Sequence, residues 1–392
     1  TGVSGDVVTV KGDGYKATET IQIDFGTCYT IATTTASTRG TFSATFIVNN
    51  QEGGIKQITA TGLESALEQN PSFMTNIFKI IGKIYNVWPQ SGIVGSEIAV
   101  EGSGFQQNET VTVHFGTSQT ITTTTVNNSN GTFSVTFIVD TQGYGLKTIT
   151  AIGLQSNAVG ITENAFLVKQ NIYSINPFSD KVGEIVTVMG TGYGSGSIVS
   201  IDFGTHQTIT TTTSNSNGTF STTFRVNTQG YGFTTITARD IYDNATISFT
   251  IVSKIISIFP TYGPAYTWVT LEGTGYECRT GLETIRIDFG THYTITTTTS
   301  SLNGTFSVTF RLEPPQSAED GIDKIITATG LFSNTPATIG FDLTCNVWYL
   351  APLSGPVGTE VVVKGAGYAI EPGNIREWIE ISFGTHQTIT TV

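Results

Sequence analysis

Residues Ile201–Thr213 read IDFGTHQTITTTT, and the chain contains five versions of this stretch. The other four begin at Ile23, Val113, Ile287 and Ile381. Before the Gly-Thr pair, apolar and polar residues alternate with the two-residue period of a half-buried strand. After it come threonines, whose branched β-carbons suit a strand better than a helix. Each version therefore predicts two β-strands joined by a tight turn.

The distance between the versions gives the size of the repeating unit. Neighbouring copies lie about 90 residues apart, which is longer than a solenoid repeat and close to the size of one small β-sandwich domain. The five equivalent phenylalanines that set this spacing are Phe25, Phe115, Phe203, Phe289 and Phe383. The chain is thus predicted to be a string of β domains.

Within one repeat, residues 83–168 contain seven short segments with strand character, separated by turn residues. Phe133, Val135 and Phe137 alternate with polar residues, so we expect them to face the core. The pair Asn130-Gly131 is a strong hairpin signal, because such a turn needs positive φ angles. The predicted strands are Lys83–Trp88, Glu97–Glu101, Thr110–Phe115, Gln119–Val126, Thr132–Val139, Lys147–Ile152 and Thr162–Val168.

The predicted fold is all-β: tandem immunoglobulin-like, seven-stranded β-sandwiches in an extended rod, with incomplete terminal domains. The first domain lacks its first strand and the last lacks its final three, so the chain is expected to be an excerpt of a longer one, or to receive strands from a neighbouring molecule. The linkers are short and lack Gly/Ser runs, which predicts semi-rigid joints. The predicted domains are 1–81, 82–169, 170–252, 253–344 and 345–392.

The charge balance excludes some partners. The net charge is −12, and charged residues make up only 12% of the chain. Nucleic acids and anionic lipids attract basic surfaces, so neither is an expected partner. No apolar run is long enough for a membrane-spanning helix, so no membrane insertion is expected in this segment. An acidic, Thr- and Gly-rich chain suits an extracellular, cation-rich setting.

The first quarter of each domain resembles the opening of TIG/IPT-type immunoglobulin-like domains. The shared pattern is Pro, two residues, Gly, a second Gly, an alternating Val/Ile strand and then Gly-x-Gly-aromatic. Asp180 replaces the first glycine in one copy, and Tyr266 replaces the second in another. The four stretches that carry the pattern are Pro89–Phe105, Pro177–Tyr193, Pro260–Tyr276 and Pro352–Tyr368.

This resemblance implies a β-sandwich used for interaction or spacing, usually without enzymatic activity. Tandem arrays of such domains with Thr-rich strands resemble prokaryotic cell-surface proteins, including S-layer proteins, surface fibres and adhesin stalks. We therefore expect a structural protein outside the cell. The leading hypothesis is a subunit of an S-layer lattice or extracellular filament that self-associates through its repeated domains. The alternatives are an adhesin stalk that spaces a binding head, or a set of carbohydrate-binding modules.

Calcium is the one cofactor that the sequence suggests. Carboxylates recur just before the repeated phenylalanine and near the turn that precedes the second strand, but no Asp-x-Asp-x-Asp-Gly run supplies a complete ligand set. Solubility of the surface is the simpler interpretation of the same residues. The weak calcium candidates are Asp24, Asp202, Asp288, Glu184 and Glu360.

No pattern of catalytic residues recurs in the chain. His206, His292 and His386 follow the Gly-Thr turns, but each is alone in its domain, so no two could share a metal ion within one chain. No Ser or Cys nucleophile recurs beside a His and an acid, and no HExxH motif is present. We expect no enzymatic activity.

Asparagine sequons are the most specific local signals. Three of them, at Asn130, Asn217 and Asn303, fall on the same hairpin turn of successive domains. Asn-Gly is also what such a turn needs, so the turn interpretation is favoured over a glycan. The full set of glycosylation candidates is Asn108, Asn127, Asn130, Asn217, Asn244 and Asn303.

Overall fold

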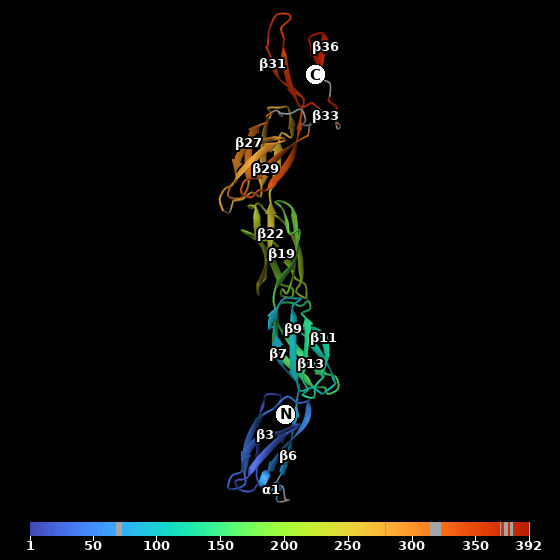
Figure 1. The fold of residues 1–392 in the computed structure, drawn as a ribbon, viewed down its shortest axis with the longest axis vertical. Helices are drawn as coiled ribbons and strands as arrows, with labels where there is room; N and C mark the ends of the chain where they lie inside the picture. The colour runs from blue at the N-terminus through green and yellow to red at the C-terminus, as the bar shows by residue number, and fades with distance from the viewer. Residues whose placement is uncertain are drawn as a thin grey trace.

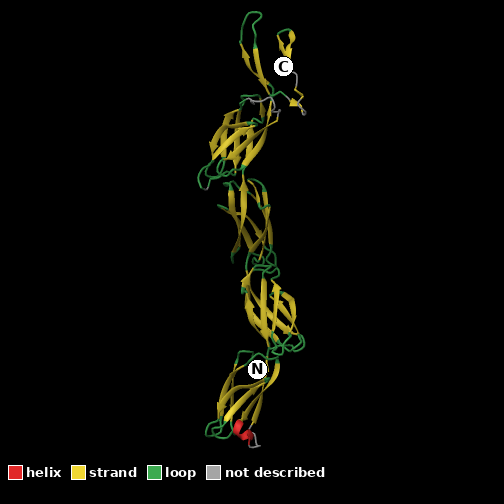
Figure 2. Ribbon diagram, in the orientation of Figure 1, coloured by secondary structure: helices red, strands yellow, loops and turns green. Residues whose placement is uncertain are grey.

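The computed structural model is a row of β-sheet units laid end to end along one long axis (Figure 1). It describes residues 1–67, 73–278, 280–313, 323–368, 370–371, 375–376 and 379–391. Almost every element in this described part is a strand, as Figure 2 shows. The one described helix, α1 (Leu63–Leu67), was not predicted; at five residues it is too short to cross a membrane.

The second unit shows the topology most clearly. One sheet has the strand order β12-β9-β7 and the other has the order β11-β10-β13-β14-β8. All pairs are antiparallel except β8 with β14, which is parallel. Its strands are β7 (Lys83–Trp88), β8 (Ser91–Gly92), β9 (Glu97–Ser103), β10 (Thr110–Phe115), β11 (Ser118–Thr125), β12 (Phe133–Ile138), β13 (Gly145–Gly153) and β14 (Val159–Val168).

This arrangement is an immunoglobulin-like sandwich, because two antiparallel sheets pack face to face and the first strand is divided between them. Sequence analysis missed β8. It is two residues long and contains a glycine, so it has neither the length nor the alternation of a recognisable strand. The break between β7 and β8 is at Trp88-Pro89, where the chain leaves one sheet and joins the other.

The third and fourth units repeat this strand order. The third has β15 (Asn171–Asn176), β16 (Ser179–Lys181), β17 (Ile185–Thr191), β18 (Ile198–Phe203), β19 (His206–Thr213), β20 (Phe220–Arg225), β21 (Gly232–Arg239) and β22 (Asn244–Val252). The fourth has β23 (Lys254–Phe259), β24 (Tyr262–Gly263), β25 (Trp268–Thr274), β26 (Thr284–Phe289), β27 (His292–Thr299), β28 (Phe306–Arg311), β29 (Asp323–Gly330) and β30 (Pro336–Leu343).

Among the residues that the structure describes, the first and last units have fewer paired strands. In the first, β3-β2-β5-β6 form one sheet and β1-β4 the other, and a parallel bridge from Gly2 to Ile80 takes the place of the short β8-type strand. Its strands are β1 (Val7–Gly12), β2 (Thr20–Phe25), β3 (Cys28–Thr35), β4 (Phe42–Ile47), β5 (Gly54–Gly62) and β6 (Phe73–Ile80). The last unit has three two-stranded sheets, formed by β31 (Asn346–Ala351) with β32 (Val362–Ala366), β33 (Ile370–Glu371) with β34 (Ile375–Arg376), and β35 (Glu380–Phe383) with β36 (His386–Thr391).

The apolar residues form four separate cores, one inside each of the first four units. The repeated phenylalanine lies at the centre of each: Phe115 is fully buried and Phe289 is 2% exposed. Phe133 and Phe137 are buried as predicted, and Val135 packs against the same cluster. Phe383 of the last unit is 76% exposed. The chain is therefore a tandem array of immunoglobulin-like sandwiches, as the sequence predicted.

Candidate functional site at the joints between sandwiches

The repeated Phe-Gly-Thr turn is held in place by a buried glutamine. The Gln142 amide donates a hydrogen bond to the Phe115 carbonyl oxygen at 2.9 Å, and its side-chain oxygen accepts one from the Thr117 N–H at 3.2 Å. Gly116 adopts φ +54°, and a Cβ there would lie 2.0 Å from the Gln142 oxygen. Only glycine fits this contact. Gln51 and Gln229 make the same bonds in their sandwiches.

The residues after this glutamine reach the next sandwich. The Tyr144 N–H donates a hydrogen bond to the Tyr193 carbonyl oxygen at 3.0 Å, and the Tyr231 N–H donates one to the Tyr276 carbonyl oxygen at 3.0 Å. At the first joint, the Gly53 N–H reaches the carbonyl oxygen of Phe105, at 3.3 Å. The loop of each of the first three joints is therefore fixed at one end by the Phe-Gly-Thr turn and at the other by the following domain.

The accepting residue is the aromatic that ends the Gly-x-Gly-aromatic motif. Tyr193 is fully buried, and its hydroxyl donates a hydrogen bond to the Ala238 carbonyl oxygen at 3.2 Å. Burial raises the pKa of Tyr193, and the nearby carboxylates of Asp240 and Asp243 raise it further. One residue thus anchors both the core of its own sandwich and the contact with the preceding one.

The Asn-Gly hairpin turn is the third element of the joint. Gly218 adopts φ +75°, and a Cβ there would lie 2.3 Å from the Tyr193 carbonyl oxygen and 2.5 Å from Gly143 Cα of the preceding sandwich. Gly131 and Gly304 are packed against the preceding sandwich in the same way. Sequence analysis assigned these glycines to turn geometry alone. Contact across the joint is a second reason for them.

Side-chain contacts differ from joint to joint. Tyr144 stacks on Tyr242 with ring centroids 5.3 Å apart and planes inclined by 19°. Lys254 pairs with Glu184 at 3.0 Å across the following joint. That hydrogen bond from Lys254 lowers the pKa of Glu184, but both groups are partly exposed, so the pair contributes little to stability.

The fourth joint uses an aromatic cluster. Tyr266 occupies the place of the motif's second glycine with φ +70°, in the left-handed region that disfavours a bulky side chain. Its ring contacts the Arg311 guanidinium, 4.5 Å from the ring centroid, and the Trp348 ring of the last unit, at a centroid distance of 5.7 Å. The departure from the family pattern at Tyr266 therefore coincides with a contact between units.

Sequence analysis missed a buried glutamate at the start of the second sheet. Glu109 is fully buried and accepts hydrogen bonds from the Gln155 N–H at 3.3 Å and the Ser156 N–H at 3.0 Å. Glu19 and Glu283 occupy the same place and bind the equivalent loops. Burial acts to raise the pKa of Glu19, but hydrogen bonds from Ser65 and Lys16 outweigh it and hold the pKa below its ordinary value. The repeated Glu-Thr pair was the available signal.

Three of the calcium candidates bind the protein's own backbone. Asp202 accepts a hydrogen bond from the Thr208 N–H at 2.7 Å and pairs with Arg239 at 2.9 Å. Thr208 has φ +50°, so the carboxylate caps a strained bulge in the hairpin. Asp24 and Asp288 cap Thr30 and Thr294 at the same distance. Asp288 is buried, contrary to the expectation that these residues face solvent, and its carboxylate also pairs with Arg286 at 3.0 Å.

The structure does not gather the remaining candidates. Glu184 is paired with Lys254, and Glu360 is exposed. Within the described ranges, no group of three or more His, Cys, Asp or Glu side chains could hold a metal ion. His206 is exposed at the start of β19, beside Thr205 of the turn. His292 is half-buried, and the side chain of His386 lies outside the described residues.

All six sequon asparagines are exposed. Asn217 and Asn303 lie next to the glycines that touch the preceding sandwich, so a glycan there would stand beside a joint. The Thr219 hydroxyl donates a hydrogen bond to the Asn217 side-chain oxygen at 3.1 Å, and Thr305 does the same to Asn303 at 2.8 Å. Glycosylation stays a prediction.

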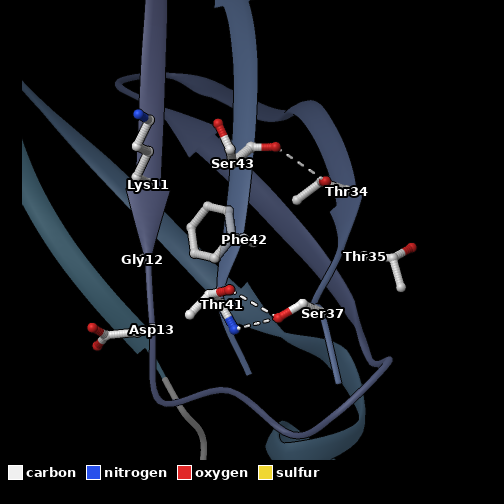
Figure 3. A pocket seen from close by; sticks show the side chains of 9 residues that line it. All are labelled: Lys11, Gly12, Asp13, Thr34, Thr35, Ser37, Thr41, Phe42 and Ser43. Carbon is white, nitrogen blue, oxygen red and sulfur yellow. Dashed lines mark hydrogen bonds between the residues drawn. The ribbon is translucent and has the colours of Figure 1, made fainter. Parts of the chain in front are cut away.

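A shallow open groove in the first sandwich is lined mainly by hydroxyl groups (Figure 3). Equivalent residues line a groove in the fourth sandwich, between β25, β27 and β28. Phe42 forms part of the wall but is only 7% exposed, since its ring packs against Tyr15 at 5.2 Å. Sugar rings stack on exposed aromatic faces, which this groove does not offer.

No protein-family model matches the sequence, and no curated protein does. Solved structures with a similar fold include the ICAM-5 D1–D4 ectodomain fragment, at 10% identity over 88% of this chain and 97% of that chain, with a TM-score of 0.21. Another is invasin, a bacterial integrin-binding protein, at 14% identity over 88% of this chain and 81% of that chain, with a TM-score of 0.21. A third is SGBP-B of Bacteroides ovatus in complex with a mixed-linkage heptasaccharide, at 12% identity over 78% and 86% and a TM-score of 0.22. Sequence identities and TM-scores this low carry no information about what this chain binds.

The polar groups that recur in the repeats have structural tasks. The glutamine holds the Phe-Gly-Thr turn, the glutamate holds a loop, and the aspartate caps a bulge. Each of these side chains accepts hydrogen bonds from backbone N–H groups. Of these groups, the glutamine lies just before the residues that bond to the next sandwich, so it supports the joint, which is the candidate functional site of the chain.

Proposed function

We propose that the chain is a structural protein of the cell surface, and that its rod of immunoglobulin-like sandwiches is a subunit of an S-layer lattice or an extracellular filament. The observation that carries this proposal is the repeated joint. A backbone hydrogen bond and a contact between two glycines join the sandwiches at each of the second and third joints. Such contacts restrict bending between neighbouring sandwiches, so the rod can transmit force and hold its two ends at a fixed distance.

The chemistry of the repeats supports a role without catalysis. Their recurring carboxylates and amides are engaged by backbone N–H groups, as shown for Glu109, Gln142 and Asp202. The net charge of −12 keeps separate rods soluble until specific contacts form. The resemblance of the opening motif to TIG/IPT-type domains adds support for interaction or spacing outside the cell.

Assembly through a repeated domain has a physical advantage. Each domain presents similar surfaces, so a second contact between two rods forms at high effective concentration once the first has formed. Weak contacts at successive domains then add up to a stable array. Calcium at the joints and glycans on the exposed asparagines would modify such an array, and both remain proposals.

Electron microscopy of the purified 392-residue chain over a range of concentrations tests this function. We expect sheets or fibres at high concentration and stiff rods at low concentration, with sedimentation velocity reporting the transition. Monodisperse rods at every concentration, with and without calcium, would contradict assembly and favour the adhesin stalk.

A further inference from the structure

One sheet in each of the first four sandwiches ends in a long strand that has no hydrogen-bonded strand on its outer side within the described residues. The strands β3, β11, β19 and β27 have eight residues each and are the last members of their sheets. Within the described part of the chain, each pairs only with the strand before it, β2, β10, β18 or β26. We call these four strands the threonine edges. The backbone N–H and C=O groups on their outer sides are available to another strand.

Apart from a bulge near the hairpin turn, the threonine edges lack the devices that usually prevent pairing between molecules. They contain no Lys, Arg, Asp, Glu or Pro. In the second, third and fourth sandwiches the other end of the same sheet differs, since β8, β16 and β24 are only two or three residues long. Natural proteins protect edges by such short strands, by charges and by bulges. The bulge of each hairpin lies near the turn, and from Thr122 to Thr125 the ladder of β11 is regular.

The charge distribution indicates what can approach these edges. The chain has a net charge of −12, so two copies repel each other over most of their surface. An edge without charged residues is where that repulsion is smallest. Tyr29 and Tyr293 lie on β3 and β27 and are 82% and 78% exposed, and exposed aromatics are enriched at protein interfaces.

The edges also point in different directions around the rod. In Figure 1, β3 and β27 lie on the left of their sandwiches, whereas β11 lies on the right. A rod whose edges all faced one way could pair with one neighbour only. A rod with edges on both sides can contact a neighbour on each side, which favours a sheet of rods over a closed pair.

We propose that the threonine edges are the contact between copies of this chain, each pairing antiparallel with a threonine edge of a neighbouring rod. The sheet of one sandwich then continues into the sheet of the next molecule through main-chain hydrogen bonds. One edge of about four regular residues is a weak contact, so stable assembly needs several edges together. This inference rests on the proposed assembly and names the surface that would carry it.

The test uses a charged variant of the full chain, Thr33→Lys, Thr123→Lys, Thr211→Lys and Thr297→Lys. These equivalent threonines are exposed on the threonine edges, where lysine is a natural blocker of pairing. The control is Gln57→Lys, Thr148→Lys, Thr235→Lys and Ile325→Lys, four exposed and equivalent positions on the central strands β5, β13, β21 and β29. Both variants gain the same charge, and circular dichroism confirms that each remains folded.

We expect the edge variant to need at least tenfold higher concentration to assemble in sedimentation velocity, and the control to behave as the wild type. If both variants assemble like the wild type, the proposal that the threonine edges form the contact is overturned, while the proposed assembly still stands. Loss of assembly in both would place the contact on the sheet face and also overturn the inference. A wild-type chain that never assembles would refute the proposed function instead.

Hydrogen exchange on the wild-type chain gives a second reading that needs no variant. Assembly should slow the exchange of amides in β11 and β19 and leave those of the central strands β13 and β21 unchanged. Slowed exchange confined to other strands would overturn the proposal even if the edge variant failed to fold.

Discussion

The Tyr144 N–H donates a hydrogen bond to the Tyr193 carbonyl oxygen, 3.0 Å away in the next sandwich. The same bond, at 3.0 Å, joins Tyr231 to Tyr276 at the following joint. Because both groups belong to the backbone, the contact does not depend on which side chain stands there, and Gly53 makes a similar bond to Phe105. The bond requires two backbone segments of the chain to approach closely, and the glycines at the joint allow this approach.

Replacing Gly218 by alanine should loosen the joint between the second and third sandwiches. The new methyl group would meet the Tyr193 carbonyl oxygen and Gly143 Cα, and alanine at φ +75° adds about 1 kcal/mol of strain. We expect small-angle X-ray scattering to report a more flexible rod. Gly196→Ala is the matched control, since Gly196 has φ +68° and no atom within 4 Å of its Cβ position. Equal scattering changes in the two variants would mean that backbone strain, and not contact, is responsible.

Gln142→Ala should destabilise the second sandwich by about 1–3 kcal/mol, because it leaves the buried Phe115 carbonyl oxygen without the Gln142 amide donor. The joint loop should also become accessible, since the glutamine fixes its start. Limited proteolysis near Gly116 and hydrogen exchange at Tyr144 measure this effect. Gln119→Ala, at an exposed position of β11, should change neither. If the Tyr144 amide exchanges as slowly in the Gln142 variant as in the wild type, the glutamine stabilises the turn but not the joint.

The repeat and the alternation in Phe133–Phe137 were enough to predict the fold class, because strand period and burial are local properties of the sequence. The short strand β8 and the helix α1 could not be predicted, since they are too brief for any periodicity.

The joint could be predicted only in part. Short linkers indicated semi-rigid connections, but nothing local shows that Gly218 touches Gly143, which is 75 residues earlier in the sequence. The aspartates were read as surface groups because β-bulges leave no sequence pattern, so their backbone partner six residues later was not foreseen. The sequence did carry one unused clue, the Glu-Thr pair that recurs at Glu19, Glu109 and Glu283.

The second sandwich has His114 where three others have the aspartate that caps a strained threonine. Thr120 of this sandwich has φ +59°, so its bulge has the same shape without the carboxylate. His114→Asp should stabilise the sandwich by about 1 kcal/mol, because the new carboxylate can accept the Thr120 N–H. The reverse change, Asp202→His, should destabilise the third sandwich by at least as much. Calorimetry of the full chain measures both, and shifts of the same sign would refute the capping role.

Glu19 makes the stability of the first sandwich depend on pH. Hydrogen bonds from Ser65 and Lys16 hold its pKa below the ordinary value, so the ionised form is favoured in the folded state. This contribution is fully present above the ordinary pKa of an unfolded glutamate, about 4.3, and is lost as the pH falls through the lower pKa of the folded state.

Glu19→Gln should therefore lower the unfolding temperature of the first sandwich at neutral pH, because an amide cannot accept every bond that the carboxylate accepts from Ser65. The same variant should differ less from the wild type at a pH low enough to protonate the wild-type carboxyl in the folded state as well. Calorimetric scans of the full chain at the two pH values measure the difference. Glu64→Gln, an exposed neighbour paired with Lys16, serves as the control and should show little effect at either pH. A Glu19 variant that is destabilised equally at both pH values would show that the shape of the side chain, and not its charge, holds the loop.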